Sequence, residues 1–197
     1  MNDSALIIMA KYPDPDTVKT RLSGSMSPQE RVGLYEKLLH NTISRLSGLS
    51  GIDTIINYTP YNADSYFKMF GSDVFPQVEG DIGERMFRAI EEVIGRGYGK
   101  TVLVGVDIPD LTGGIVENAF SMLEHNDLVF GPALDGGYYL IGMKKPLEAI
   151  FRDIQWSSPH TLQQTIVVAE SLGRTIAYTE YLQDVDTIED VHNKGLI

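Results

Sequence analysis

The chain has 197 residues, of which 43 % are hydrophobic, and its 27 acidic and 16 basic side chains give a formal net charge of −11. This length and apolar content are sufficient for one globular domain with a sizeable core, and they argue against disorder as a description of the whole chain. Because a strongly acidic surface repels nucleic acid and anionic lipid, we expect neither as a partner. Any bound phosphate must therefore be held locally, by a few placed cations or by a metal ion.

Composition also excludes several classes of site. Cysteine is absent, which removes disulfides, thiolate nucleophiles and cysteine-bound zinc or iron–sulfur centres. The four histidines lie far apart and form no His-x-x-x-His pair, so a zinc site of that type is not expected. No apolar stretch approaches the roughly 18 residues of a membrane span, and the N-terminus lacks the basic segment of a signal peptide. We therefore expect a soluble, cytoplasmic protein.

Short apolar runs alternate along the chain with segments of helical period. In chain order, the pattern predicts a strand at 5–9, an irregular basic loop at 11–25, a helix from 28 to about 46, a strand at 52–58, a short helix at 64–70, a weaker strand at 73–78 and a helix at 82–94. It continues with a strand at 101–106, a helix at 115–123, strands at 128–130 and 138–142, a helix at 160–172 and a strand at 175–178. The first long helix has a well-marked start, with Ser27 as N-cap, Pro28 at the first helical position and Glu30 three residues after the cap.

This order of elements predicts the fold class. Alternating strands and helices build a three-layer α/β sandwich around a mixed, mostly parallel sheet. The run at 101–106 is the most continuous stretch of β type, which is typical of a central strand covered on both faces. No repeat, low-complexity tract or linker interrupts the chain, so we expect residues 1–197 to form a single domain.

The first informative cluster runs from Lys11 to Leu22, directly after the first predicted strand. In open α/β sheets ligands bind beyond the carboxyl ends of strands, so this loop lies where a ligand is expected. Lys19 and Arg21 are two residues apart and would project from the same side of an extended chain, where the two cations suit a di- or triphosphate. The alternative is a solvated loop whose charges offset Asp14 and Asp16.

An aspartate closes the predicted central strand, in the sequence Gly105-Val-Asp107-Ile-Pro109-Asp110-Leu111. A carboxylate at this place points into the crevice, while Pro109 ends the strand and turns the chain. Mg²⁺ prefers one or two carboxylates together with substrate phosphate oxygens and water, so Asp107 is the leading candidate for a metal ligand. The alternative for Asp107 or Asp110 is a cap on the following turn.

Acidic residues gather again at Asp184-Val-Asp186-Thr187-Ile-Glu189-Asp190, in a window from 175 to 193 that contains no Lys or Arg. Unpaired carboxylates repel one another and raise their own pKa values unless a cation is present, which favours a metal at Asp186. The alternative is that Asp186 or Thr187 caps a final short helix, with Glu189 and Asp190 in its first turn.

Three further segments are candidates for ligand contacts. In the turn 135–137, adjacent glycines let the backbone approach a ligand and Asp135 can bind a polyol or amine acceptor, although a plain hairpin turn has the same sequence. Asp81 opens the helix predicted at 82–94, either next to a nucleotide or only as its cap. Trp156 precedes the helix predicted at 160–172, where it forms a pocket wall or packs in the core.

Taken together, these motifs resemble those of a known family. They occur in the order seen in the bacterial and archaeal glycosyltransferase-A-like family often called radical-SAM/selenodomain-associated transferase, within the nucleotide-diphospho-sugar transferase superfamily. The resemblance extends from about residue 5 to residue 190 and is carried by Lys11…Pro15…Val18-Lys19-Thr20-Arg21-Leu22, Asp81-Ile-Gly83-Glu84-Arg85-Met86, Gly105-Val-Asp107-Ile-Pro109-Asp110-Leu111, Gly131-Pro-Ala-Leu-Asp135-Gly136-Gly137-Tyr138-Tyr139, Trp156-Ser157 and Asp184-Val-Asp186-Thr187.

The resemblance implies roles for individual residues. It implies Mg²⁺ or Mn²⁺ as cofactor, with Asp107 and Asp186 as metal ligands. The implied nucleotide contacts are Lys11, Lys19, Thr20, Arg21, Asp81, Gly83 and Glu84. The implied acceptor contacts are Asp135, Gly136, Gly137, Tyr138 and Trp156, and Lys19, Arg21 and Asp135 would act in catalysis.

The expected function is therefore metal-dependent group transfer from a nucleotide-activated donor to a small-molecule acceptor. Glycosyl transfer from a nucleotide-diphospho-sugar is the leading hypothesis. The alternatives are nucleotidyl transfer from an NTP, similar to that of the 2-phospholactate guanylyltransferases, and a non-catalytic nucleotide-binding module. The base, the acceptor and the oligomeric state stay open.

Overall fold

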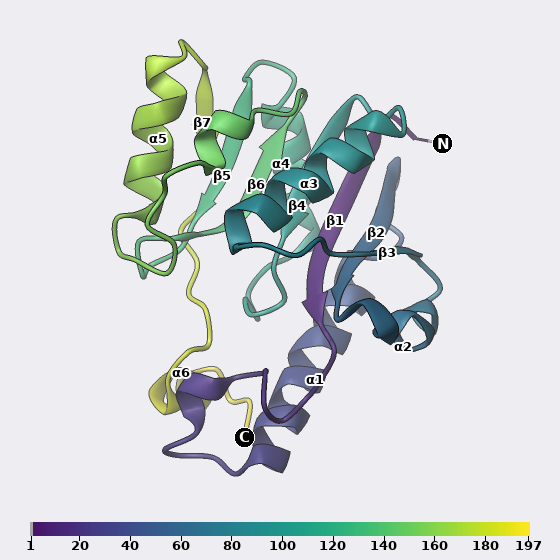
Figure 1. Cartoon of the computed structure of the whole chain (residues 1–197), viewed down its shortest axis with the longest axis vertical. Coiled ribbons are helices and arrows are strands. Elements are labelled where there is room, and N and C mark those ends of the chain that lie inside the picture. The colour runs from purple at the N-terminus through teal and green to yellow at the C-terminus, as the bar shows by residue number, and fades with distance from the viewer. Residues whose placement is uncertain (1) are drawn as a thin grey trace.

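One mixed sheet organises the protein, which is described here by a computed structural model covering residues 2–197 (Figure 1). Its seven strands lie in the order β3-β2-β1-β4-β6-β5-β7, and all neighbours are parallel except β6, which runs antiparallel to β4 and β5. The strands are β1 Ser4–Lys11, β2 Ile52–Thr59, β3 Asp73–Pro76, β4 Lys100–Val104, β5 Leu128–Pro132, β6 Tyr138–Met143 and β7 Ile176–Tyr178. The predicted mixed, mostly parallel sheet is confirmed.

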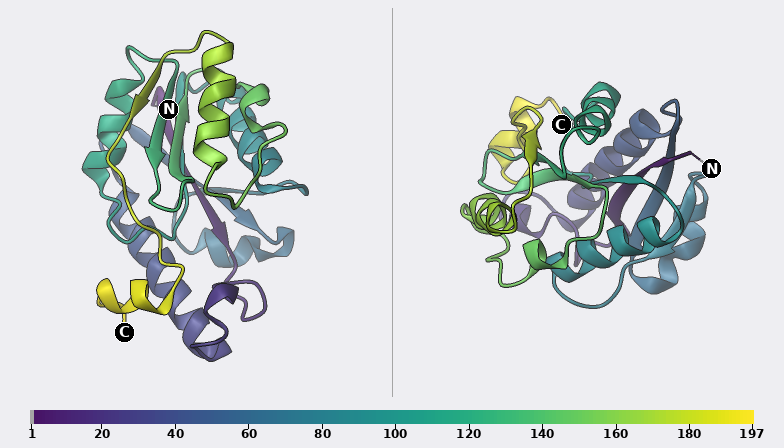
Figure 2. Two further views of the ribbon diagram at one scale, coloured as in Figure 1. Left: turned by 90° about the vertical axis from the view of Figure 1, so that its left-hand side faces the viewer. Right: turned by 90° about the horizontal axis from the view of Figure 1, so that it is seen from above.

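Helices cover both faces of this sheet and complete a three-layer arrangement (Figures 1 and 2). The α-helices are α1 Pro28–Leu46, α2 Asp64–Lys68, α3 Ile82–Gly95, α4 Gly113–Met122, α5 Thr161–Ser171 and α6 Ile188–Asn193. Short 3₁₀ helices span Thr20–Leu22, Tyr61–Ala63 and Glu148–Phe151. Among residues 2–197, no helix combines the length and the apolar character needed to cross a lipid bilayer.

Strand β1 shows why the sequence forms two cores. Leu6 and Ile8 face the cluster built with α1 and α4, whereas Ile7 and Met9 face the cluster built with α3 and α5. Successive side chains of a strand point to opposite faces, so a continuous apolar run is what a strand covered on both sides requires.

A third, smaller core joins the two ends of the chain. Leu22 and Met26 pack with Leu34 of α1 and with Val185 and Val191 from the C-terminal segment. In Figure 1, the segment after β7 runs down past the end of the sheet, and α6 lies beside the loop that follows β1. Burial of these apolar side chains holds a cationic and an acidic segment, far apart in sequence, at the same end of the sheet.

The alternative that Asp186 or Thr187 caps a final short helix is confirmed for Thr187, which is the N-cap of α6. Its side chain accepts a hydrogen bond from the Asp190 amide at 3.2 Å, and the Asp190 carboxylate accepts from the Thr187 amide at 2.8 Å. Burial opposes ionisation of Asp190, but the hydrogen bonds from Thr187 and Asp186 outweigh it and leave the pKa of this carboxyl lowered.

The loop before α5 is fixed against α3 by one close contact. A Cβ at Gly83 would overlap the ring of Trp156 and lie 2.8 Å from the Phe151 carbonyl oxygen. The Trp156 ring also meets Tyr138 edge-on, with ring centroids 6.3 Å apart. Gly83 is thus required by packing between α3 and this loop.

We predict that Gly83→Ala destabilises the protein by about 1–3 kcal/mol, because the added methyl group has no room. Gly33→Ala is the matched control, since Gly33 is also helical and a methyl group added there would have no neighbour within 4 Å. It should leave stability unchanged or raise it by roughly 0.5–1 kcal/mol through helix propensity. Chemical denaturation of both variants measures the difference, and a Gly83→Ala protein as stable as wild type would contradict the packing argument.

Candidate functional site

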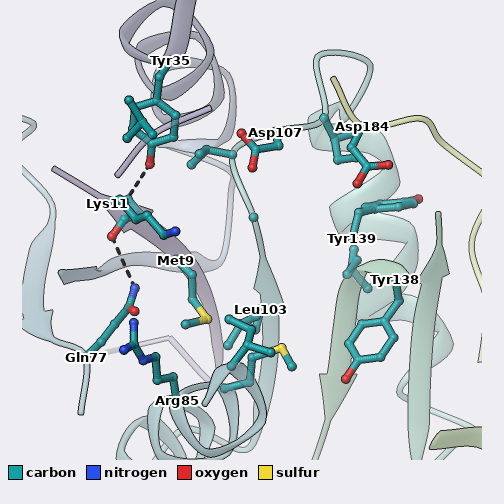
Figure 3. Close-up of a pocket in the computed structure, with 18 of the residues that line it drawn as sticks. Met9, Lys11, Tyr35, Gln77, Arg85, Leu103, Asp107, Tyr138, Tyr139 and Asp184 are labelled. Carbon is teal, nitrogen blue, oxygen red and sulfur yellow. Dashed lines mark hydrogen bonds between the residues drawn. The ribbon is translucent and has the colours of Figure 1, made fainter. Parts of the chain in front are cut away.

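A cavity of about 440 Å³ opens at the carboxyl ends of β1 and β4 (Figure 3). The chain runs outward from β1 to β2 and β3 and then returns to β4 on the other side of β1, so the strand order reverses between β1 and β4. Ligands of open α/β sheets bind at such a point. The polar residues of the cavity wall include Lys11, Lys19, Gln77, Arg85, Asp107, Tyr138 and Asp184.

Lys19 forms the central ionic contact of the site. Its Nζ lies 2.8 Å from Asp107 Oδ1 and donates a hydrogen bond of 2.6 Å to the Val185 carbonyl oxygen. The Val185 amide in turn donates to the Asp107 carbonyl oxygen at 3.1 Å. The Lys19 side chain is only 4 % exposed, so one buried ammonium joins the loop after β1, the end of β4 and the C-terminal segment.

Arg21 differs from Lys19 in both exposure and partner. Its side chain is 60 % exposed and pairs with the carboxylate of Asp186. The expectation that Lys19 and Arg21 project side by side from an extended chain is wrong, because Lys19 adopts a left-handed conformation with φ 50° and the 3₁₀ helix Thr20–Leu22 follows it. The turn sends the two cations to different aspartates.

Three carboxylates form an acidic cluster on the side of the cavity where Asp184 lies, away from Arg85 and Gln77 (Figure 3). Asp135, Asp184 and Asp186 each offer one oxygen, and these oxygens lie within 4.8 Å of one another. Burial raises the pKa of Asp184 to about 6, with further contributions from the negative charges of Asp135, Asp186 and Asp107. Carboxylate oxygens are the ligands that Mg²⁺ and Mn²⁺ prefer, so this donor set fits a hard divalent ion.

The turn at Asp135 is shaped by its neighbours. Asp135 Oδ1 accepts a 2.8 Å hydrogen bond from the Gly137 amide, and the other carboxylate oxygen is not needed for the turn. Gly136 has φ 90°, and a Cβ there would overlap the Pro159 carbonyl group. The Gly136 carbonyl oxygen accepts from the Leu162 amide at 3.0 Å, which ties the turn to the start of α5. Glycine at 136 therefore serves backbone conformation and packing.

Some residues implied by the resemblance lie away from the cavity. Asp81 caps α3 by accepting from the Glu84 amide at 2.9 Å, and Glu84 pairs with Arg88 at 2.7 Å. Both acidic residues line a separate hollow of about 390 Å³. Trp156 and Gly83 pack against each other, and Thr20 lies in the exposed 3₁₀ turn.

Other residues implied by the resemblance do come together. The structure places Lys11, Lys19, Asp107 and Tyr138 in the wall of one cavity. The acidic cluster reaches this wall at Asp184 and so connects Asp135 and Asp186 to the same site. Arg21 is connected to it through its ion pair with Asp186.

Several residues that line the cavity were not predicted from the sequence, among them Asp184, Arg85, Met86 and Gln77. Asp184 lies two positions before Asp186, a spacing that puts both carboxylates on one side of an extended segment. Arg85 and Met86 share with Ile82 the face of α3 that lines the cavity, as the i, i+3, i+4 spacing predicts. Gln77 carries no such signal; its Nε2 donates to the Ala10 and Asn57 carbonyl oxygens at 3.3 and 3.0 Å.

The raised pKa of Asp184 predicts a pH-dependent effect on stability. Its folded-state pKa of about 6 exceeds the ordinary value of 3.8, so the ionised side chain lowers the free energy of unfolding. This penalty is absent below pH 3.8 and is complete above the folded-state pKa. In metal-free buffer, Asp184→Asn should therefore raise Tm more at about pH 8 than at about pH 4. Asp16→Asn removes an exposed acidic charge and should change Tm little at either pH. An equal shift for Asp184→Asn at both pH values would contradict the assignment.

Comparison with known proteins gives matches in family and fold. The family described as "Uncharacterized protein conserved in bacteria (DUF2064)" matches residues 42–158. A crystal structure from Desulfovibrio desulfuricans G20, which carries the provisional name nucleotide-diphospho-sugar transferase, matches with a TM-score of 0.91 and 33 % identity, over 97 % of this chain and 85 % of that chain. Among curated proteins, none is significantly similar in sequence.

Two more distant solved structures share the fold. A CMP:2-keto-3-deoxy-manno-octonic acid synthetase complexed with CTP has a TM-score of 0.62 and 11 % identity, over 97 % of this chain and 96 % of that chain. Glucosyl-3-phosphoglycerate synthase from Mycobacterium tuberculosis, in complex with Mn²⁺, UDP and glucosyl-3-phosphoglycerate, has a TM-score of 0.55 and 12 % identity, over 92 % of this chain and 70 % of that chain. Since the DUF2064 match spans more than half of the sequence, the chain belongs to the DUF2064 family of bacterial proteins.

Proposed function

We propose that this protein is a metal-dependent transferase that uses a nucleotide-activated donor, and that the donor is a nucleotide-diphospho-sugar. The observation that carries the proposal is the cavity at the β1/β4 switch point, where Lys19, Asp107 and Asp184 converge from three separate segments. A buried cation beside several carboxylates suits a ligand that combines a diphosphate with a divalent ion.

Two of the similar structures support this choice. The Desulfovibrio protein, at 33 % identity, has a name that specifies nucleotide-diphospho-sugar transfer. Glucosyl-3-phosphoglycerate synthase, which shares the fold, binds Mn²⁺ and UDP. Within this superfamily we assign the chain to the glycosyltransferase-A-like group associated with radical-SAM and selenodomain proteins, on the ordered motifs of its sequence.

The carboxylates would hold the ion and the cations would meet the phosphates. Asp107 and Asp186 are the proposed metal ligands; Asp186 belongs to the acidic cluster with Asp184, and Asp107 lines the same cavity as Asp184. A bound divalent ion would neutralise charge that develops on the leaving diphosphate. Lys11 lines the cavity, and no carboxylate among residues 2–197 lies within ion-pair distance of its ammonium group, which leaves it free to contact a phosphate.

In glycosyl transfer, an acceptor hydroxyl oxygen forms a bond to the anomeric carbon while the bond from that carbon to the diphosphate oxygen breaks. The nucleoside diphosphate leaves with the bonding electron pair, and the hydroxyl proton passes to a base. Asp135 is the proposed base, because its turn hydrogen bond occupies Oδ1 and leaves the second oxygen for the acceptor. Positioning and electrostatics supply the remainder, and no protein nucleophile is needed.

Nucleotidyl transfer is the second candidate. It is favoured by the similarity to the CTP-bound synthetase, which covers nearly the full length of both chains. In this reaction the acceptor attacks the α-phosphorus of an NTP and pyrophosphate leaves. The leaving group separates the candidates: incubation with an acceptor extract should release a nucleoside diphosphate from a sugar donor in the first case and pyrophosphate from an NTP in the second.

We predict that Asp107→Ala abolishes the metal-dependent part of nucleotide binding. Calorimetric titration of UDP-, GDP- and dTDP-sugars and of NTPs, each with and without Mn²⁺, should show for wild type at least one ligand whose affinity rises about tenfold or more with the ion. Asp107→Ala should bind that ligand equally with and without Mn²⁺, because one carboxylate ligand is lost.

Asp110→Ala is the control for this experiment. Asp110 lies three residues further along the same loop, pairs with Lys194 and is not part of the cavity wall, so its removal should leave the Mn²⁺ effect intact. Metal-independent binding of equal strength by wild type and Asp107→Ala would remove Asp107 from the site. Nucleotide binding without turnover of any donor would favour a non-catalytic module.

A further inference from the structure

The pairing of Arg21 with Asp186 places a cation on the acidic cluster itself. Within residues 2–197, Arg21 is the one cationic side chain within 4.0 Å of any carboxylate oxygen of Asp135, Asp184 or Asp186. Within residues 2–197, the three neighbouring carboxylates thus have one cationic partner, which contacts Asp186. Arg21 lies in the 3₁₀ helix Thr20–Leu22 of the loop that follows β1, the same loop that contributes Lys19 to the cavity wall.

We propose that Arg21 occupies the place of the divalent ion in the ion-free protein and moves to the donor phosphates when the ion binds. This inference rests on the proposed function. In the absence of the ion, Arg21 offsets part of the repulsion among the three carboxylates. A divalent ion offsets more of this repulsion, since it carries twice the charge and accepts several carboxylate oxygens at once. The displaced guanidinium then becomes available to the diphosphate.

The difference in solvent exposure between the two side chains indicates that Arg21, and not Lys19, makes this exchange. The Arg21 side chain is 60 % exposed and that of Asp186 is 32 % exposed, and ion pairs with this much solvent access are weak. Lys19 is 4 % exposed and is held by both Asp107 and the Val185 carbonyl oxygen. Arg21 can therefore change partners at little cost, whereas Lys19 stays in place.

The exchange couples the two ligands. An ion that binds first releases the phosphate-binding cation, and a diphosphate that binds first draws Arg21 away from the carboxylates that the ion needs. Each ligand must then strengthen the binding of the other by the same factor, because the coupling free energy is shared. Without Arg21 the part of the coupling that comes from the exchange should disappear, whereas direct contact between the ion and the diphosphate contributes in both proteins.

The test compares wild type with Arg21→Gln, using Mn²⁺ and inorganic pyrophosphate as probes. Pyrophosphate presents a diphosphate without fixing the base, and titrations are corrected for the Mn²⁺–pyrophosphate complex formed in solution. We expect Arg21→Gln to bind Mn²⁺ alone about two- to fivefold more tightly, since the competing guanidinium is gone. Pyrophosphate binding in the presence of EDTA should weaken, because the diphosphate can no longer draw Arg21 from Asp186 to itself.

The coupling factor is the decisive measurement. In wild type, saturating pyrophosphate should tighten Mn²⁺ binding by direct contact with the ion and by about two- to fivefold more through the release of Arg21. In Arg21→Gln the coupling factor should be about two- to fivefold smaller than in wild type, and Arg21→Lys, which keeps the charge, should recover part of the difference. Arg152→Gln is the matched control, since Arg152 is 67 % exposed and pairs with Glu148. It should behave as wild type in all three titrations.

Two outcomes would overturn the inference. If Mn²⁺ and pyrophosphate bind with an Asp107-dependent affinity but the coupling factor is the same in wild type and Arg21→Gln, Arg21 does not exchange partners, and the proposed function is unaffected. If neither probe binds to wild type in any combination, the proposed function itself fails and the role of Arg21 fails with it.

Discussion

The buried ammonium of Lys19 is the contact on which the site depends. It joins the Asp107 carboxylate to the Val185 carbonyl oxygen and so connects three segments that are up to 166 residues apart in sequence. A buried ammonium without a partner would destabilise the fold, and the carboxylate and the carbonyl oxygen supply the compensation. Arg31 supports the same loop from α1 by donating to the Val18 carbonyl oxygen at 3.0 Å. Leu22 and Met26 pack in one apolar cluster with Val185 and hold the C-terminal segment against this loop.

Charge balance gives the site its character in a protein of net charge −11. The carboxylates gather on one side of the cavity, and the cations Lys11 and Arg85 line other parts of its wall (Figure 3). An acidic cluster with too few cations is unfavourable on its own, and the neighbouring carboxylates add to the burial that raises the pKa of Asp184. Such a cluster attracts cations and repels a lone anion, which is the physical basis of the proposed metal dependence.

The fold determines the location of the site more strongly than the type of reaction that takes place there. The β1/β4 switch point opens a crevice because the connection that leaves β1 and the connection that leaves β4 run in opposite directions, and this holds for any sequence with this strand order. Structures with the same fold include a CTP-bound synthetase and a synthase bound to UDP and glucosyl-3-phosphoglycerate. The distinction between such reactions lies in the side chains of a site and not in the sheet that carries them.

The sequence by itself determined the sheet, the main helices and one half of the site. The apolar run before Asp107 and the Ser27–Glu30 capping box are local signals, and local signals fix strands, caps and the position of a carboxylate at a strand end. Only the tertiary structure decided which cation meets which aspartate. The left-handed turn at Lys19, the overlap that would follow from a side chain at Gly83, and the packing of Val185 against Leu22 all depend on contacts between distant segments. Periodicity along a chain carries no information about such contacts, because it records which face of an element is apolar and not which element covers it.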